Sequence, residues 1–142
     1  LGIFTLKDIK LNSFVDPLVP GVTCHVASIE ANLSLSDPSD SAVSCRQTGE
    51  ITPAMIARIK KGKTGEVVFE KSKSVFLKTL KIRRIFDEES QTLMYLSYST
   101  RETSGSFKHS LSTIPLWGTA AYIEPQSKRQ ATEPQRNRTQ SF

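Results

Sequence analysis

The sequence predicts a β-rich α+β domain: an antiparallel meander of about six or seven strands, folded as a sandwich or a partly open barrel, with one short helix near 53–61. Three observations support this fold class. Short runs in which apolar and polar residues alternate recur through most of the chain, as they do in half-buried strands. Clusters of Pro, Gly, Asp and Ser separate these runs. One stretch carries clear start and stop signals of a helix.

The first half of the chain contains three predicted strands. The first covers residues 3–14 and ends at Asp16-Pro17, and a Pro20-Gly21 turn follows it. The second surrounds Cys24 and reaches Ile29. The third surrounds Cys45 and stops near Gly49. The polar residues 30–41 between the second and third strands are expected to be mostly loop.

The helix is predicted from its punctuation. Thr52 suits the N-cap and Pro53 suits the first helical position. Gly62 suits the residue just beyond the end. Between them, Met55, Ile56 and Ile59 share one face at helical spacing, so this face is expected to pack on the sheet.

The second half returns to strands, at residues 66–70, 75–86, 92–99 and 107–117. Polar turns are expected at 71–74 and at 87–90. Apolar residues occupy both faces of the 92–99 segment, which predicts a central strand covered on both sides. The Ile114-Pro115 bond places the last strand at an edge, because proline cannot donate to the ladder.

The 142 residues fit one folded domain over 1–123, followed by a basic and polar tail over 124–142 that is expected to be disordered. No apolar run approaches the roughly 20 residues that a transmembrane helix needs. The two cysteines, Cys24 and Cys45, lie in strand-like segments about twenty residues apart. They predict one disulfide between adjacent strands, which requires an oxidising compartment.

The net charge of +5 is concentrated in one segment. Residues 58–84 contain ten of the nineteen Lys and Arg against two acidic residues, a local balance of +8. This segment predicts contact with an anionic partner, or else a solvated sheet face. Its basic residues divide between both faces of the 75–86 strand, which argues against a nucleic-acid groove. The candidate contact residues are Lys60, Lys61, Lys63, Lys71, Lys73, Lys78, Lys81, Arg83 and Arg84.

Two enzymatic functions remain alternative hypotheses. A hydrolase could use Asp37 or Asp40 with His25 or Arg46, although turn formation explains the aspartates equally well. A thiol redox protein could use the two cysteines, but neighbouring residues on a strand face opposite ways, so His25 does not naturally reach Cys24. Cysteine and histidine spacings match no metal site, and no motif for a cofactor is present.

Several motifs, taken in order, resemble the CreA family of bacterial periplasmic proteins. The most extended is Asp37-Pro-Ser-Asp-Ser-Ala-Val-Ser-Cys-Arg-Gln-Thr-Gly-Glu-Ile51. Other motifs fit in the same order: Phe14-Val-Asp-Pro17 followed by Val22-Thr-Cys24, then Gly65-Glu-Val-Val-Phe69, the 93–99 segment and the 110–115 segment. The resemblance therefore covers about residues 3–117. It implies export to the periplasm, supports the Cys24–Cys45 disulfide, and supplies no catalytic residue. The leading hypothesis is therefore a non-enzymatic periplasmic protein that acts through binding or envelope maintenance. Its expected partner is an anionic surface such as lipid headgroups, polysaccharide or an acidic protein.

Overall fold

The computed structural model describes residues 4–6, 9–29, 41–73, 78–99, 109–125 and 139. These residues form strands and one helix in the order β1 (Phe4–Leu6), β2 (Ile9–Val15), β3 (Val22–Ile29), β4 (Ser41–Gln47), α1 (Pro53–Arg58), β5 (Glu66–Lys73), β6 (Lys78–Asp87), β7 (Thr92–Ser99) and β8 (His109–Pro115). The predicted β-rich fold class with one short helix is confirmed.

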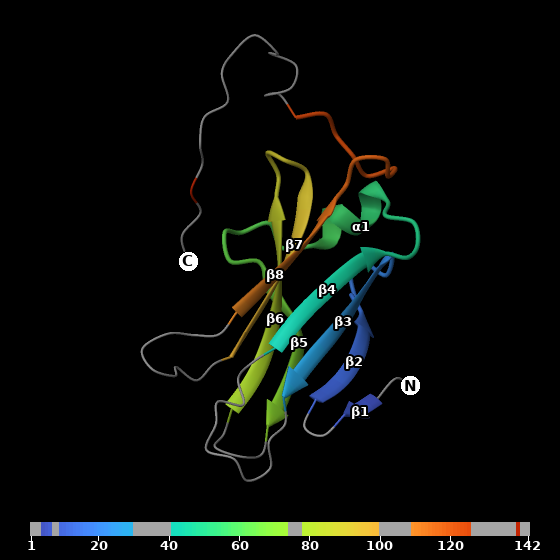
Figure 1. The fold of residues 1–142 in the computed structure, drawn as a ribbon. Helices are drawn as coiled ribbons and strands as arrows, with labels where there is room; N and C mark the ends of the chain where they lie inside the picture. The colour runs from blue at the N-terminus through green and yellow to red at the C-terminus, as the bar shows by residue number, and fades with distance from the viewer. Residues whose placement is uncertain are drawn as a thin grey trace.

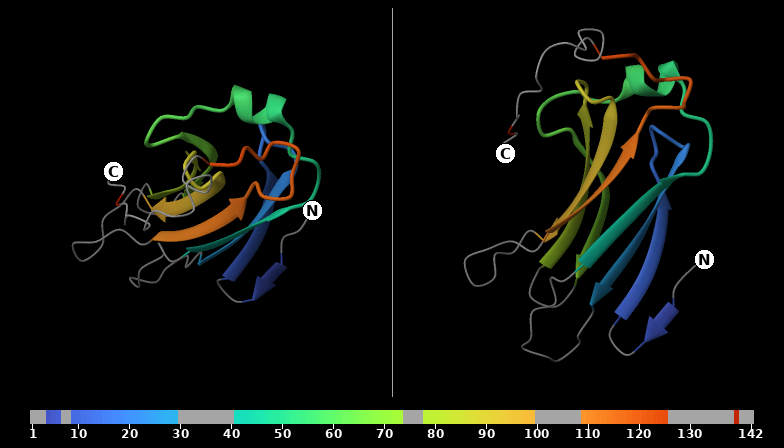
Figure 2. Two further views of the ribbon diagram at one scale, coloured as in Figure 1. Left: turned by 90° about the horizontal axis from the view of Figure 1, so that it is seen from above. Right: turned by 45° about the horizontal axis from the view of Figure 1, so that its top comes forward.

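The described strands form two antiparallel meanders of four strands each, β1-β2-β3-β4 and β5-β6-β7-β8. Figures 1 and 2 show that the two sheets meet along β4 and β8. Side-chain hydroxyls join them there, because Ser110 Oγ accepts from the Val43 N–H at 3.1 Å and Ser112 Oγ accepts from the Cys45 N–H at 2.8 Å. These two N–H groups on the edge of β4 are therefore hydrogen-bonded, although no described strand pairs with that edge.

One hydrophobic core lies between the two sheets. Strands of both sheets contribute to it, and α1 closes one end (Figure 1). Thr52 Oγ1 accepts from the Met55 N–H at 3.3 Å, which confirms the predicted N-cap. The helix ends at Arg58, three residues before the predicted end. Ile59 leaves the helical conformation with ψ 152° and is buried in the core.

Three expectations need correction. The segment 3–14 is divided into two strands, and β1 pairs back on β2 with Phe4 opposite Leu11. β5 continues to Lys73, through the turn expected at 71–74. β7 is central, as predicted, but alternate side chains along it are buried and half-buried, so one face is covered much better than the other.

The position of β8 agrees with its proline, because it is the last strand of its sheet. The expected loop 30–41 and the expected tail 124–142 fall almost entirely outside the described residues, as do residues 75–77 of the predicted 75–86 strand. No described helix is long and apolar enough to cross a bilayer.

Candidate functional site

The predicted disulfide between Cys24 and Cys45 is present. The two residues lie directly opposite each other on β3 and β4, and both side chains are fully buried. His25 is exposed, on the other face of β3. This arrangement separates the imidazole from the sulfur atoms, as the alternation of strand side chains predicts.

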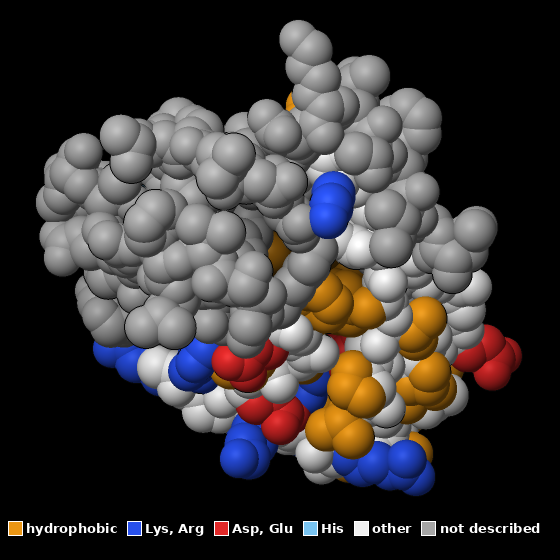
Figure 3. Space-filling model, turned by 90° about the horizontal axis from the view of Figure 1, so that it is seen from below, with side chains coloured by type: hydrophobic (Ala, Val, Ile, Leu, Met, Phe, Trp, Pro, Cys, Tyr) orange, Lys and Arg blue, Asp and Glu red, His pale blue; other side chains and the backbone are white. Residues whose placement is uncertain are grey.

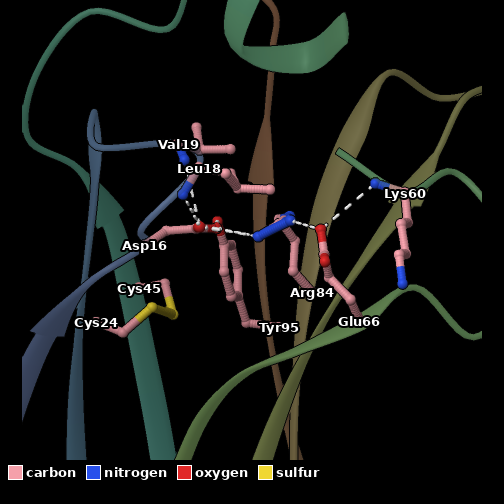
Figure 4. Close-up of polar contacts among 9 residues, drawn as sticks. All are labelled: Asp16, Leu18, Val19, Cys24, Cys45, Lys60, Glu66, Arg84 and Tyr95. Carbon is pink, nitrogen blue, oxygen red and sulfur yellow. Dashed lines mark hydrogen bonds and ion pairs between the residues drawn. A yellow bond between two sulfur atoms is a disulfide. The ribbon is translucent and has the colours of Figure 1, made fainter. Parts of the chain in front are cut away.

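A buried polar network lies between the two sheets, close to the disulfide (Figure 4). Its centre is Asp16, which follows β2 and is 0% exposed. Asp16 Oδ1 accepts from the backbone N–H groups of Leu18 at 3.0 Å and Val19 at 3.2 Å, which fixes the turn after β2. Asp16 Oδ2 accepts from the Tyr95 hydroxyl at 2.6 Å, so a residue of the other sheet holds the same carboxylate.

The counter-ion of Asp16 is Arg84 on β6, which is 1% exposed. Arg84 Nη1 donates to Asp16 Oδ1 at 2.8 Å, and Arg84 Nη2 donates to Glu66 Oε1. One guanidinium therefore connects a carboxylate of each sheet. Next to Glu66, the backbone of Gly65 lies close to the backbone of Arg84. Gly65 has φ +60°, and a Cβ at that position would lie 1.9 Å from the Arg84 carbonyl oxygen, so the position requires glycine.

The environment shifts the pKa of two groups in the network. Burial raises the pKa of the Tyr95 hydroxyl, and the negative charge of Asp16 and the hydrogen bond to it raise it further. Partial burial acts to raise the pKa of Glu66, but its hydrogen bonds with Arg84 and the Lys60 N–H, and the positive charges of both residues, lower it overall. The network therefore holds Tyr95 neutral and Glu66 ionised at neutral pH.

The chemical role of this network is to join the sheets. Asp16 has four donor groups around it and no exposed surface, so its carboxylate is not placed to act as an acid or base on a substrate from solution. A buried ion pair of this kind favours one arrangement of the two sheets, since any other would leave a charge unpaired.

Sequence reasoning missed this network. It treated Asp16 as the end of a strand and placed Arg84 among the basic contact residues. Arg84 is instead buried and paired with two carboxylates, so it is not a surface contact. The signal was present in the alternation of β6, because Arg84 shares the period-two face of Leu80, Ile82 and Phe86, which are all buried.

The remaining basic candidates lie in different places. Lys60, Lys61 and Lys63 are exposed in the connection between α1 and β5. Lys81 and Arg83 are half-buried on the side of β6 opposite Arg84. The backbone of Lys71, Lys73 and Lys78 lies in β5 and β6, but their side chains are outside the described set.

A family model described as CreA protein matches residues 2–119. The chain belongs to the CreA family. It is 41% identical over 115 residues to Protein CreA of Escherichia coli K12, a match that covers 76% of this chain and 72% of the relative. The match to Protein CreA of Escherichia coli O157:H7 has the same identity and coverage. No solved structure matches the chain significantly. The matched region of this CreA family member includes both sheets, the disulfide and the buried network.

Of the alternative hydrolase residues of this CreA family member, the structure describes only His25 and Arg46. Asp37 and Asp40 fall outside the described residues. His25 and Arg46 are exposed on strands β3 and β4, and the Arg46 guanidinium donates to the carbonyl of Cys45. His109, within the predicted 107–117 strand, begins β8. Within the described parts of the chain, no three His, Cys, Asp or Glu residues gather as a metal site.

The surface of this CreA family member carries exposed apolar side chains on both sheets. At the end of the molecule away from α1, Figure 3 shows hydrophobic side chains beside both basic and acidic ones. That end therefore has no surface of a single charge sign. Arg58, Lys60, Lys61 and Lys63 gather near α1, and no Asp or Glu occurs among residues 51–65.

Proposed function

We propose that this CreA family member is a non-enzymatic periplasmic binding protein that contacts an anionic envelope component through Lys60, Lys61 and Lys63. The observation that carries the proposal is the exposure of these three lysines within four residues, next to Arg58, which is also exposed. Such a group attracts anions and raises their local concentration.

The surrounding residues strengthen this positive charge. The next acidic residue along the chain is Glu66, and its carboxylate accepts from Arg84 in the buried network. Glu66 is thus shared between the interior and this connection, because the Lys60 backbone N–H also donates to it at 3.4 Å and the Lys60 charge acts on it. Residues 51–65 contain Arg58, Lys60, Lys61 and Lys63 and no acidic residue, so this connection carries a local charge of +4.

The periplasmic location is supported by the disulfide and by the family. A buried disulfide persists in oxidising compartments, of which the bacterial periplasm is one. Full burial of both sulfur atoms also counts against a thiol redox function, since exchange requires attack on an accessible sulfur.

The test is binding to three anionic probes at about 0.05 M and 0.5 M salt: phosphatidylglycerol vesicles, dextran sulfate and polyglutamate. The variant K60Q/K61Q/K63Q should weaken binding to at least one probe by about a hundredfold at low salt, from roughly 1 kcal/mol per cation near an anionic surface. The matched variant K60R/K61R/K63R keeps the charge and should bind as the parent does.

Added salt should weaken the same interaction, since exposed charges are screened over about 10 Å at 0.1 M. Binding that is indifferent both to salt and to the three glutamines would overturn the proposal.

A further inference from the structure

The outer face of the β5–β8 sheet carries apolar side chains that the core does not use. Strand register places Val67, Arg83, Leu96 and Leu111 in one row across all four strands. Ile85 and Met94 are opposite each other in the next row. We call Val67, Met94, Leu96 and Leu111 the outer-face patch, whereas Ile85 is buried.

The four side chains of the patch are separate from the hydrophobic core, which contains none of them. Leu111 is 55% exposed and Val67 is 37% exposed, at the two ends of the row. Met94 and Leu96 are half-buried between them, and Ile85 is 1% exposed. The apolar residues on the two sides of β7 thus differ in burial: Leu93 and Tyr95 lie in the core, whereas Met94 and Leu96 are half-buried on the outer face.

Two basic residues of β6, Arg83 and Lys81, lie on this face of the sheet. Arg83 lies within the row, and its guanidinium donates to the Tyr98 hydroxyl at 2.8 Å and to the Thr64 carbonyl at 3.3 Å. The second contact ties the connection that carries Lys60, Lys61 and Lys63 to the same sheet. Lys81 is half-buried on β6, in register between Glu70 and Tyr98.

The acidic residues near this face lie at its margins. Glu70 is on the edge strand β5, and Asp87 begins the acidic turn 87–89 where β6 ends. This face and the connection tied to it by Arg83 contain five cations, namely Lys60, Lys61, Lys63, Lys81 and Arg83. Against Glu70 and Asp87 the balance is +3, and it falls to +1 when Glu88 and Glu89 of the turn are included.

We propose that the outer-face patch and its cations bind the surface of an anionic phospholipid bilayer. The inference rests on the proposed function and names its anionic component. Aliphatic side chains enter the boundary between headgroups and acyl chains, while lysine and arginine contact phosphates. Lysine is depleted in protein–protein interfaces, which are enriched in aromatic anchors, so the composition favours lipid over a protein partner.

The experiment is vesicle flotation of the full chain with two lipid compositions, phosphatidylglycerol mixed with phosphatidylcholine, and phosphatidylcholine alone. The parent protein should bind the anionic vesicles in low salt and bind the neutral ones much more weakly. The double variant V67T/L111S should bind the anionic vesicles about tenfold more weakly, because it removes half-exposed apolar area that the bilayer would cover.

The matched control is Leu11→Ser, which removes a side chain of similar exposure, 42%, from the outward face of the other sheet. It should leave vesicle binding unchanged. Thermal unfolding of every variant, followed by circular dichroism, identifies any loss of binding that comes from unfolding; should V67T/L111S be unstable, Leu111→Ser alone should still weaken binding more than Leu11→Ser does.

The outcomes separate the two proposals. If V67T/L111S and Leu11→Ser bind equally well while K60Q/K61Q/K63Q loses binding, the patch plays no part and the anionic contact stands. Binding to dextran sulfate or polyglutamate without binding to vesicles also overturns the lipid assignment alone. Insensitivity to the lysine changes with every probe overturns both.

Discussion

Replacing Arg84 with methionine should be among the most damaging single changes in this fold. The substitution keeps most of the side-chain volume but removes the cation between Asp16 and Glu66. Breaking a buried ion pair by removing one partner typically costs about 3–5 kcal/mol, because the remaining charge stays buried and unpaired.

Two features of the structure narrow the expected cost of Arg84→Met. Glu66 is 23% exposed at its side chain, so water can solvate it in part once Arg84 is gone. Asp16 is fully buried, but it keeps two backbone N–H donors and the Tyr95 hydroxyl. We therefore expect a loss near the lower limit, about 3 kcal/mol. Domains of this kind are stable by only about 5–15 kcal/mol, so the variant should unfold at a clearly lower urea concentration.

The assay is urea unfolding at neutral pH, with Arg83→Met as the matched control. Arg83 is the next residue of β6 but is half-buried and outward, so its loss should cost about 1 kcal/mol or less. A double-mutant cycle with Asp16→Asn isolates the pair, since asparagine can still accept from the turn N–H groups. The reasoning would be refuted if Arg84→Met cost less stability than Arg83→Met. It would also be refuted if the costs of Arg84→Met and Asp16→Asn added within about 0.5 kcal/mol in the double variant.

Three further predictions concern the same interior. The pKa of Glu66 is lowered on folding, so its contribution to stability is present above the unfolded pKa of about 4.3 and is lost as pH falls through the folded value; Glu66→Gln should flatten the acid limb of the stability curve measured between pH 7 and 3, and an unchanged limb would contradict this. The pKa of Tyr95 is raised, so its contribution is complete below the unfolded pKa of about 10 and is lost at higher pH; Tyr95→Phe should cost about 1–3 kcal/mol in urea unfolding, because Asp16 loses a buried donor, whereas a cost near zero would show that the hydroxyl adds nothing. Non-reducing mass spectrometry should find Cys24 and Cys45 oxidised, two hydrogens lighter than the dithiol, and C24A/C45A should lose about 3 kcal/mol of stability; ready reduction of the native protein would instead favour a redox function.

Most strands could be predicted because their cause is local. Alternation with period two identified Val22–Ile29, and an apolar run between polar turns identified Thr92–Ser99. The Thr52-Pro53 signal identified the start of α1, since all of these patterns depend only on residues close in sequence. The helix end was wrong because it depends on packing. Ile59 is more stable in the core than in another helical turn, and the Gly62 signal does not report that.

The sequence by itself determined the β-rich class, the disulfide, the family and the basic segment near α1, because each follows from residue types and their spacing. Only the tertiary structure determined which basic side chains point outward and which are buried. Arg83 and Arg84 are adjacent in sequence, yet one is outward and the other joins two carboxylates inside the molecule. The partner Asp16 is 68 residues away, and no local pattern can show that two sheets will bring such residues together between them.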